Sequence, residues 1–90
     1  MGRNKKQVER VQTGVRIEKQ LLKVLKAVAA RNEIGLGDLI EGIVLHSFEG
    51  KQPFGPETRD FIDQMRQAYR LDLTADDSHA LTEDVGAQKT

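Results

Sequence analysis

The sequence predicts a small, mainly α-helical domain that opens with a single β-strand. Three observations lead to this expectation. The chain has 90 residues and no cysteine, so it is long enough for one hydrophobic core and contains no disulfide bridges. Apolar residues recur with a period of two near the N-terminus, and with a helical period in three later segments. No second segment has the pattern of a strand.

The predicted strand runs from Arg10 to Ile17. One side carries Val11, Thr13, Val15 and Ile17, and the other carries Arg10, Gln12, Gly14 and Arg16. A lone strand leaves its backbone N–H and C=O groups without partners. It therefore either pairs with another chain or stays disordered.

Two helices follow the predicted strand. The first is expected from Lys19 to about Asn32, with an apolar stripe built on Leu21, Leu25 and Val28. Lys19, Lys23 and Lys26 share its opposite side, which we expect to be a solvated face. Residues 33–37 break the helix, with Gly35 as a candidate cap. The second helix is expected from Leu36 or Asp38 to Phe48.

The C-terminal half is expected to hold a third helix and an acidic tail. Pro56 suits the first turn of a helix, because its missing N–H would have no partner there. This helix carries an apolar stripe of Phe61, Ile62, Met65, Ala68 and Tyr69. The predicted organisation is a basic flexible arm (1–7), a strand-and-helix domain (8–50), a loop with the third helix (51–70) and an acidic, partly disordered tail (71–90).

Charge is divided unevenly along the chain, although 14 basic and 14 acidic residues give a net charge of zero. Residues 1–32 hold nine basic and two acidic residues, a net charge of +7. Residues 33–90 hold five basic and twelve acidic residues, a net charge of −7. Such asymmetry indicates a polyanion-binding face beside an acidic region.

Several classes of protein are not expected. Without cysteine there is no thiolate nucleophile or Cys-ligated metal, and the two isolated histidines, His46 and His79, do not suggest a metal site. We expect no cofactor and no enzymatic activity, because no combination of neighbouring side chains predicts a catalytic triad. The absence of a long apolar run or a signal-peptide pattern favours a cytoplasmic protein that does not contact membranes.

The order of elements resembles a known DNA-binding family. A strand, a helix, a glycine-containing turn and a helix lie within about 40 residues, carried by Thr13–Ile17, Leu21–Leu25 and Ile34–Ile40. This pattern is similar to the ribbon-helix-helix family (MetJ/Arc/CopG-type). The resemblance implies an intertwined homodimer whose two strands pair as an antiparallel ribbon in the major groove of double-stranded DNA. It implies a sequence-specific transcriptional repressor that reads an inverted-repeat operator and is associated with the nucleoid.

The resemblance also implies roles for individual residues. Arg can bind the O6 and N7 atoms of guanine, and Gln can bind the N6 and N7 atoms of adenine. The implied base contacts are Gln12, Gly14 and Arg16. The implied phosphate contacts are Lys5, Lys6, Arg10 and Lys19, with the backbone of Leu36 and Gly37 at the start of the second helix. The implied dimer core is Val11, Val15, Ile17, Leu21, Leu25, Leu39, Ile40, Ile43 and Val44.

Three alternatives stay open on the sequence. Residues 56–84 either pack on the core and enlarge it or bind a protein partner, as in antitoxins whose C-terminal extension wraps a toxin. A third alternative is a protein–protein adaptor without DNA activity, whose strand completes the sheet of another protein. The sequence also leaves open whether dimers assemble further on DNA.

Overall fold

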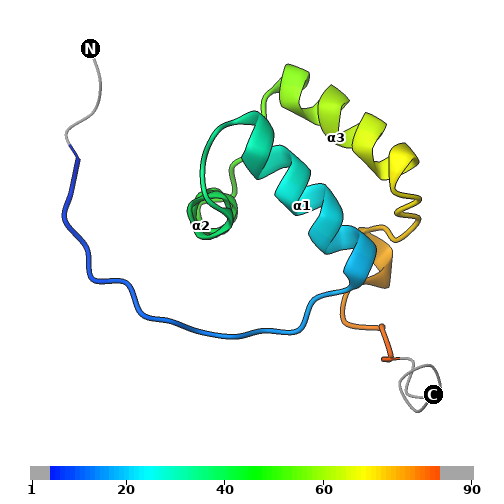
Figure 1. Cartoon of the computed structure of the whole chain (residues 1–90), viewed down its shortest axis with the longest axis horizontal. Coiled ribbons are helices and arrows are strands. Elements are labelled where there is room, and N and C mark those ends of the chain that lie inside the picture. The colour runs from blue at the N-terminus through cyan, green and yellow to red at the C-terminus, as the bar shows by residue number, and fades with distance from the viewer. Residues whose placement is uncertain (1–4, 84–90) are drawn as a thin grey trace.

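The chain forms three α-helices joined by short loops. The computed structural model describes residues 5–83, with α1 at Lys19–Arg31, α2 at Leu36–Phe48, α3 at Pro56–Ala68 and a single 3-10 turn, η1, at Ala75–Asp77. Helix α1 lies between the other two (Figure 1). It contacts both of them, whereas α2 and α3 do not contact each other. No helix within residues 5–83 has the length and apolar character needed to cross a lipid bilayer.

The predicted N-terminal strand is wrong. Residues 5–18, which we call the N-terminal arm, form a drawn-out segment without secondary structure, and no residue from 5 to 83 belongs to a strand (Figure 1). A strand requires ladder hydrogen bonds to a neighbour, and residues 5–17 make no backbone–backbone hydrogen bond within the described chain. The ribbon-helix-helix architecture is therefore not the observed fold, while the mainly α-helical character agrees with the structure.

The start of α1 is set by a side chain of the preceding residue. The Glu18 carboxylate accepts a hydrogen bond from the Leu21 N–H at 2.7 Å, which satisfies one of the free donors of the first turn. The residues that cap the N-terminal ends of α2 and α3 are Gly35 and Gly55, neither of which offers a side-chain cap, and Pro56 occupies the first position of α3. The first turns of α2 and α3 thus keep free N–H groups.

All three α-helices end in the same backbone motif, in which a left-handed residue lets two N–H groups bond back onto the last turn. The left-handed residues are Glu33 after α1 (φ 57°), Gly50 after α2 (φ 70°) and Arg70 after α3 (φ 56°). Glu33 and Arg70 are followed by Ile34 and Leu71, whose side chains pack in the core, whereas an exposed residue follows Gly50. Burial of the next side chain offsets the backbone strain after α1 and α3, while α2 relies on glycine.

The hydrophobic core is small and centred on α1. The buried residues of the described chain are Val24, Val28, Ala29, Leu39 and Leu71. Partly buried apolar side chains pack around them: Leu25, Ile34, Ile43, Phe54, Phe61, Ile62, Met65 and Leu73. Most of the apolar stripe predicted for the third helix therefore packs inside this chain. With so few buried residues, each one contributes a large share of the stability.

Helix α2 keeps an apolar surface on the side away from the core. Leu39 is its one buried residue, and Ile43 packs partly against the core. Its outer face carries Ile40, Val44, Leu45 and Phe48, of which Leu45 is 63% and Phe48 81% exposed. This outer face of α2 is available to another molecule.

Candidate nucleic-acid interface

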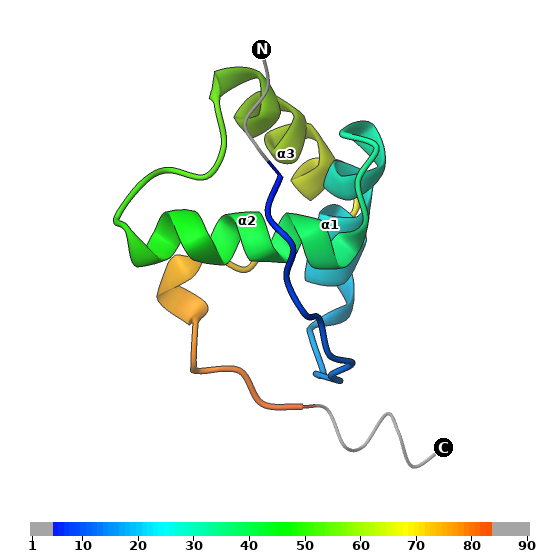
Figure 2. The same cartoon turned by 90° about the vertical axis from the view of Figure 1, so that its left-hand side faces the viewer.

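The N-terminal arm is the most exposed part of the described chain. Every residue from 5 to 16 is exposed, and the side chains of Val8, Val11 and Val15 are 65–79% exposed. The arm passes across α2 in Figure 2 and stands apart from that helix in Figure 1. Its backbone and side chains are thus open to a binding partner.

One ion pair ties the arm to α2. The Arg10 Nε and Nη2 atoms donate to the two carboxylate oxygens of Glu41, each at 2.8 Å. The hydrogen bonds and the opposite charge of this pair raise the pKa of Arg10. The hydrogen bonds from Arg10 lower the pKa of Glu41, an effect that partial desolvation opposes. Arg10, one of the predicted phosphate contacts, is therefore occupied by a carboxylate in the free chain.

A second ion pair connects the end of the arm with the C-terminal segment. The Arg16 Nε donates to Glu83 Oε1 at 3.2 Å, and the Arg16 Nη2 donates to Glu83 Oε2. The hydrogen bond and charge of Glu83 raise the pKa of Arg16. Both side chains stay largely open to solvent, with 79% of Arg16 and 48% of Glu83 exposed. The predicted base-reading arginine thus holds an anion at the molecular surface.

The other two predicted base contacts are open to solvent. Gln12 is exposed. Gly14 has open space around it, because a Cβ built there would meet nothing within 4 Å. The arm can therefore present Gln12 to a partner and can carry a side chain at position 14 without a clash.

The remaining predicted phosphate contacts lie in three places. Lys5 and Lys6 are exposed at the beginning of the described arm, and Lys19 is exposed at the first position of α1. Leu36 and Gly37 occupy the first turn of α2, whose cap Gly35 offers no side-chain hydrogen bond. That turn keeps free N–H donors for an anion, although it also contains Asp38.

The residues predicted to form a dimer core fall into two groups. Leu39 is buried within the chain, and Leu25 and Ile43 pack partly against the same core. Ile17 and Ile40 are partly buried. The exposed members are Val11, Val15, Leu21 and Val44. The structure thus places four of the nine dimer-core candidates on surfaces that can contact a second molecule.

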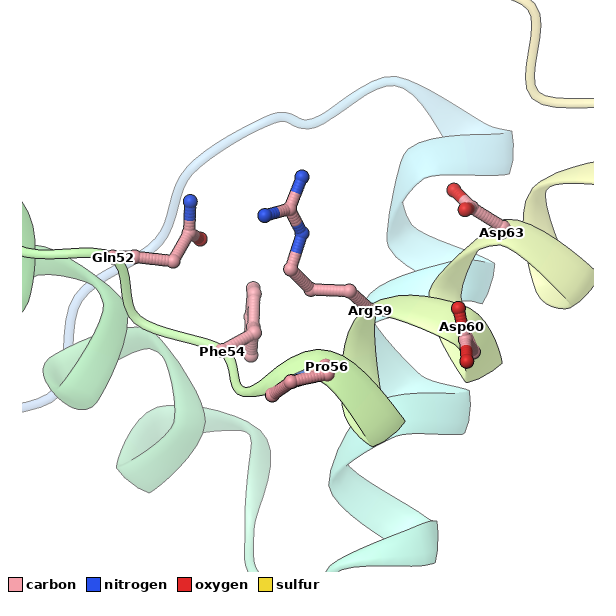
Figure 3. Close-up of a pocket in the computed structure, with 6 residues that line it drawn as sticks. All are labelled: Gln52, Phe54, Pro56, Arg59, Asp60 and Asp63. Atoms are coloured by element: carbon pink, nitrogen blue, oxygen red, sulfur yellow. The ribbon is translucent and has the colours of Figure 1, made fainter.

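An open hollow of about 470 Å3 lies where the loop after α2 meets α3. Figure 3 shows its lining residues, Gln52, Phe54, Pro56, Arg59, Asp60 and Asp63. Arg59 extends over Phe54 toward Gln52, while the two aspartates project from α3. This mixture of charges favours neither an anion nor a cation. Among residues 5–83, His, Cys, Asp and Glu side chains form no group of three or more that could hold a metal ion.

The two arginine–glutamate contacts were not predicted from the sequence. They join residues that lie 31 and 67 positions apart. The only sequence signal was the excess of basic residues before position 32 and of acidic residues after it. That excess indicates that the two regions attract each other, without specifying which residues pair.

Comparisons with protein-family models, with curated proteins and with solved structures find no match to this chain. Its function is therefore argued from its own residues, and the exposed, cationic N-terminal arm is its strongest candidate site.

Proposed function

We propose that this chain binds double-stranded DNA through its N-terminal arm. It acts as a homodimer, most simply as a transcriptional repressor that reads an inverted-repeat operator. The observation that carries this proposal is the exposure of the arm: every residue from 5 to 16 is exposed, and residues 5–17 make no backbone–backbone hydrogen bond within the described chain. A segment that adds almost nothing to the core of its own chain is suited to contact a partner.

The distribution of charge supports DNA as that partner. The first 32 residues carry a net charge of +7, and the rest of the chain carries −7. Neutralising phosphates with Lys and Arg releases counterions from DNA and supplies most of the affinity for any sequence. Lys5, Lys6 and Lys19 serve this purpose, because all three are exposed.

Sequence preference is assigned to Arg16 and Gln12. A guanidinium can bind guanine through two hydrogen bonds, and a carboxamide can bind adenine in the same way. The two-pronged contact of Arg16 with a carboxylate in the free chain uses the same fork of donors. Each such base contact contributes about 1–3 kcal/mol of discrimination against the wrong base.

Homodimer formation is assigned to the outer face of α2. Val44, Leu45 and Phe48 are 37–81% exposed, and the charge of Glu41 on the same helix is already paired with Arg10. A two-fold dimer brings the same surface of both copies together, so this apolar face can pack against its counterpart on a second copy. A two-fold dimer would place two arms on the two halves of an inverted repeat.

The proposal is tested by measuring binding to a duplex from the region upstream of the protein's own coding sequence and to a random duplex of equal length. Arg16→Ala should weaken binding to the upstream duplex by about 1–3 kcal/mol. It should also reduce the difference in affinity between the upstream duplex and the random duplex. The matched control is Arg59→Ala on α3, which removes an exposed arginine outside the arm. Footprinting should show a protected inverted repeat.

Two results would contradict the proposal. Equal losses of DNA affinity in Arg16→Ala and Arg59→Ala would show that the arm does not recognise DNA. No binding to either duplex at low salt, together with capture of a protein by the arm, would instead identify the adaptor alternative.

A further inference from the structure

We propose that the acidic C-terminal segment, residues 72–83, competes with DNA for Arg16 and so limits the affinity of the free protein. This inference rests on the proposed function, because it concerns how the same arm is regulated. The observation behind it is the contact between Arg16 and Glu83, which joins the arm to the far end of the described chain.

The contact occupies the donors that a base or a phosphate would need. Glu83 receives hydrogen bonds from Nε and Nη2 of Arg16, which form one edge of the guanidinium. A guanidinium binds a carboxylate, a phosphate or the O6 and N7 atoms of guanine with the same planar fork of N–H groups. Arg16 cannot offer this edge to DNA while Glu83 holds it. Binding of the two is therefore mutually exclusive at that edge.

The path of the acidic segment is set by the folded part of the chain. Leu71, just before the segment, is buried, and the Leu73 carbonyl accepts a hydrogen bond from Arg66 Nη2 at 2.8 Å. The turn η1 is closed by reciprocal hydrogen bonds between Thr74 and Asp77. In Figure 2, η1 lies below α2, and the segment after η1 runs toward the place where the arm joins α1. These anchors direct residues 78–83 toward Arg16.

The charge of the segment matches the role of a DNA competitor. Residues 72–83 contain four acidic residues, Asp72, Asp76, Asp77 and Glu83, and no Lys or Arg. The segment thus resembles a short polyanion placed next to the basic arm. Because DNA is a far longer polyanion, it displaces the segment when it binds, and the segment lowers the apparent affinity by the fraction of chains in which it holds Arg16.

The expected effect is modest, since the ion pair is exposed to solvent. Exposed pairs of this kind shift equilibria by roughly two- to fivefold. The contact therefore biases DNA binding and does not abolish it. Its influence should decline as salt rises, because salt screens exposed pairs.

The test compares two variants that lose the same charge. Glu83→Gln removes the partner of Arg16, and Asp76→Asn removes one negative charge from η1 in the same segment. Affinity for a random duplex is measured by fluorescence anisotropy at low salt, with helix content checked by circular dichroism. Glu83→Gln should tighten binding by roughly two- to fivefold. Asp76→Asn should change it less, because only the general repulsion from DNA is reduced.

A second measurement does not require DNA. The Nε–Hε resonance of Arg16 in the free protein should move in Glu83→Gln and stay in place in Asp76→Asn. The proposed competition would be overturned if the two variants bound DNA with equally increased affinity, or if the Arg16 resonance did not move in Glu83→Gln. Either result would leave the proposed DNA binding intact. Failure of the wild type and both variants to bind any duplex would instead overturn the proposed function, and the competition with it.

Discussion

The N-terminal arm and the helical body (residues 19–71) contrast in nearly every physical property. In the body, Val28 is 2% exposed, and each α-helix ends in a defined backbone motif. In the arm, Val11 is 79% exposed, and no backbone–backbone hydrogen bond forms from residue 5 to residue 17. Burial and backbone hydrogen bonding thus give the residues of the body a role in stabilising their own chain, whereas the residues of the arm have almost no such role. This difference is the basis of our proposal that the residues of the arm serve an intermolecular contact.

The largest expected effect is on the free energy of unfolding, when the same change from valine to alanine is made in each of the two regions. Val28→Ala should lower the free energy of unfolding by about 2 kcal/mol, because it removes buried methyl groups and leaves a cavity. Val11→Ala should lower it by less than about 0.5 kcal/mol, since its side chain touches little in the free chain. Urea unfolding, at a protein concentration where the chain sediments as a monomer, measures both.

Similar losses of unfolding free energy in Val28→Ala and Val11→Ala would contradict the contrast between the body and the arm. They would show that the arm packs against the helices in solution. A larger effect of Val11→Ala at high protein concentration alone would instead place Val11 in the dimer contact.

A second comparison replaces one glycine in each region with alanine, and its expected effect on the free energy of unfolding is intermediate. Gly50 has a φ of 70° at the end of α2, so Gly50→Ala should cost about 1 kcal/mol of unfolding free energy. Gly14→Ala should cost almost nothing, because position 14 is outside the left-handed region and its Cβ would meet nothing within 4 Å. Thermal unfolding of the two variants checks this pair. A loss at position 14 as large as at position 50 would mean that the arm has a fixed conformation.

The smallest expected effect concerns the link between the regions. The hydrogen bonds from Arg10 lower the pKa of Glu41 below the ordinary 4.5. A carboxyl whose pKa is lowered by folding stabilises the folded state above its ordinary pKa, and this contribution disappears as the pH falls through the lowered value. The arm should therefore stay attached to α2 at neutral pH and detach in acid.

Titration of the Glu41 carboxyl carbon by NMR tests this link. The midpoint should lie below 4.5 in the wild type and should return toward 4.5 in Arg10→Gln. A wild-type midpoint at or above 4.5 would show that the link does not form in solution.

The helices could be predicted from the sequence because the signals for helices are local. The spacing of apolar residues along α1, the glycine before α2 and Pro56 at the start of α3 each act within a few positions. The expected start of the first helix at Lys19, the end of the second at Phe48 and the start of the third at Pro56 all agree with the structure.

Local sequence signals could not decide whether residues 10–17 form a strand. A period of two describes which side chains share a side, whereas a strand also needs a hydrogen-bonded neighbour, and none of the described residues supplies one. The same limit applies to the candidate site. Basic residues in the arm were predicted from composition, but the pairing of Arg10 with Glu41 and of Arg16 with Glu83 depends on how α2 and the C-terminal segment are placed. The predicted flexible arm (1–7) and the predicted partly disordered tail (71–90) each lie partly outside the described residues.

The most direct test of the central claim is the salt dependence of DNA binding in two variants that lose equal charge. Lys5→Gln/Lys6→Gln alters the arm, and Arg59→Gln/Arg70→Gln alters the exposed side of the body around α3. Each phosphate contact contributes about 0.9 to the slope of log affinity against log salt concentration. The arm variant should therefore flatten the slope by about 1.8, and the body variant should leave it unchanged. Equal changes in the two variants, or a wild-type affinity that does not respond to salt, would contradict the assignment of the arm as the DNA-binding element.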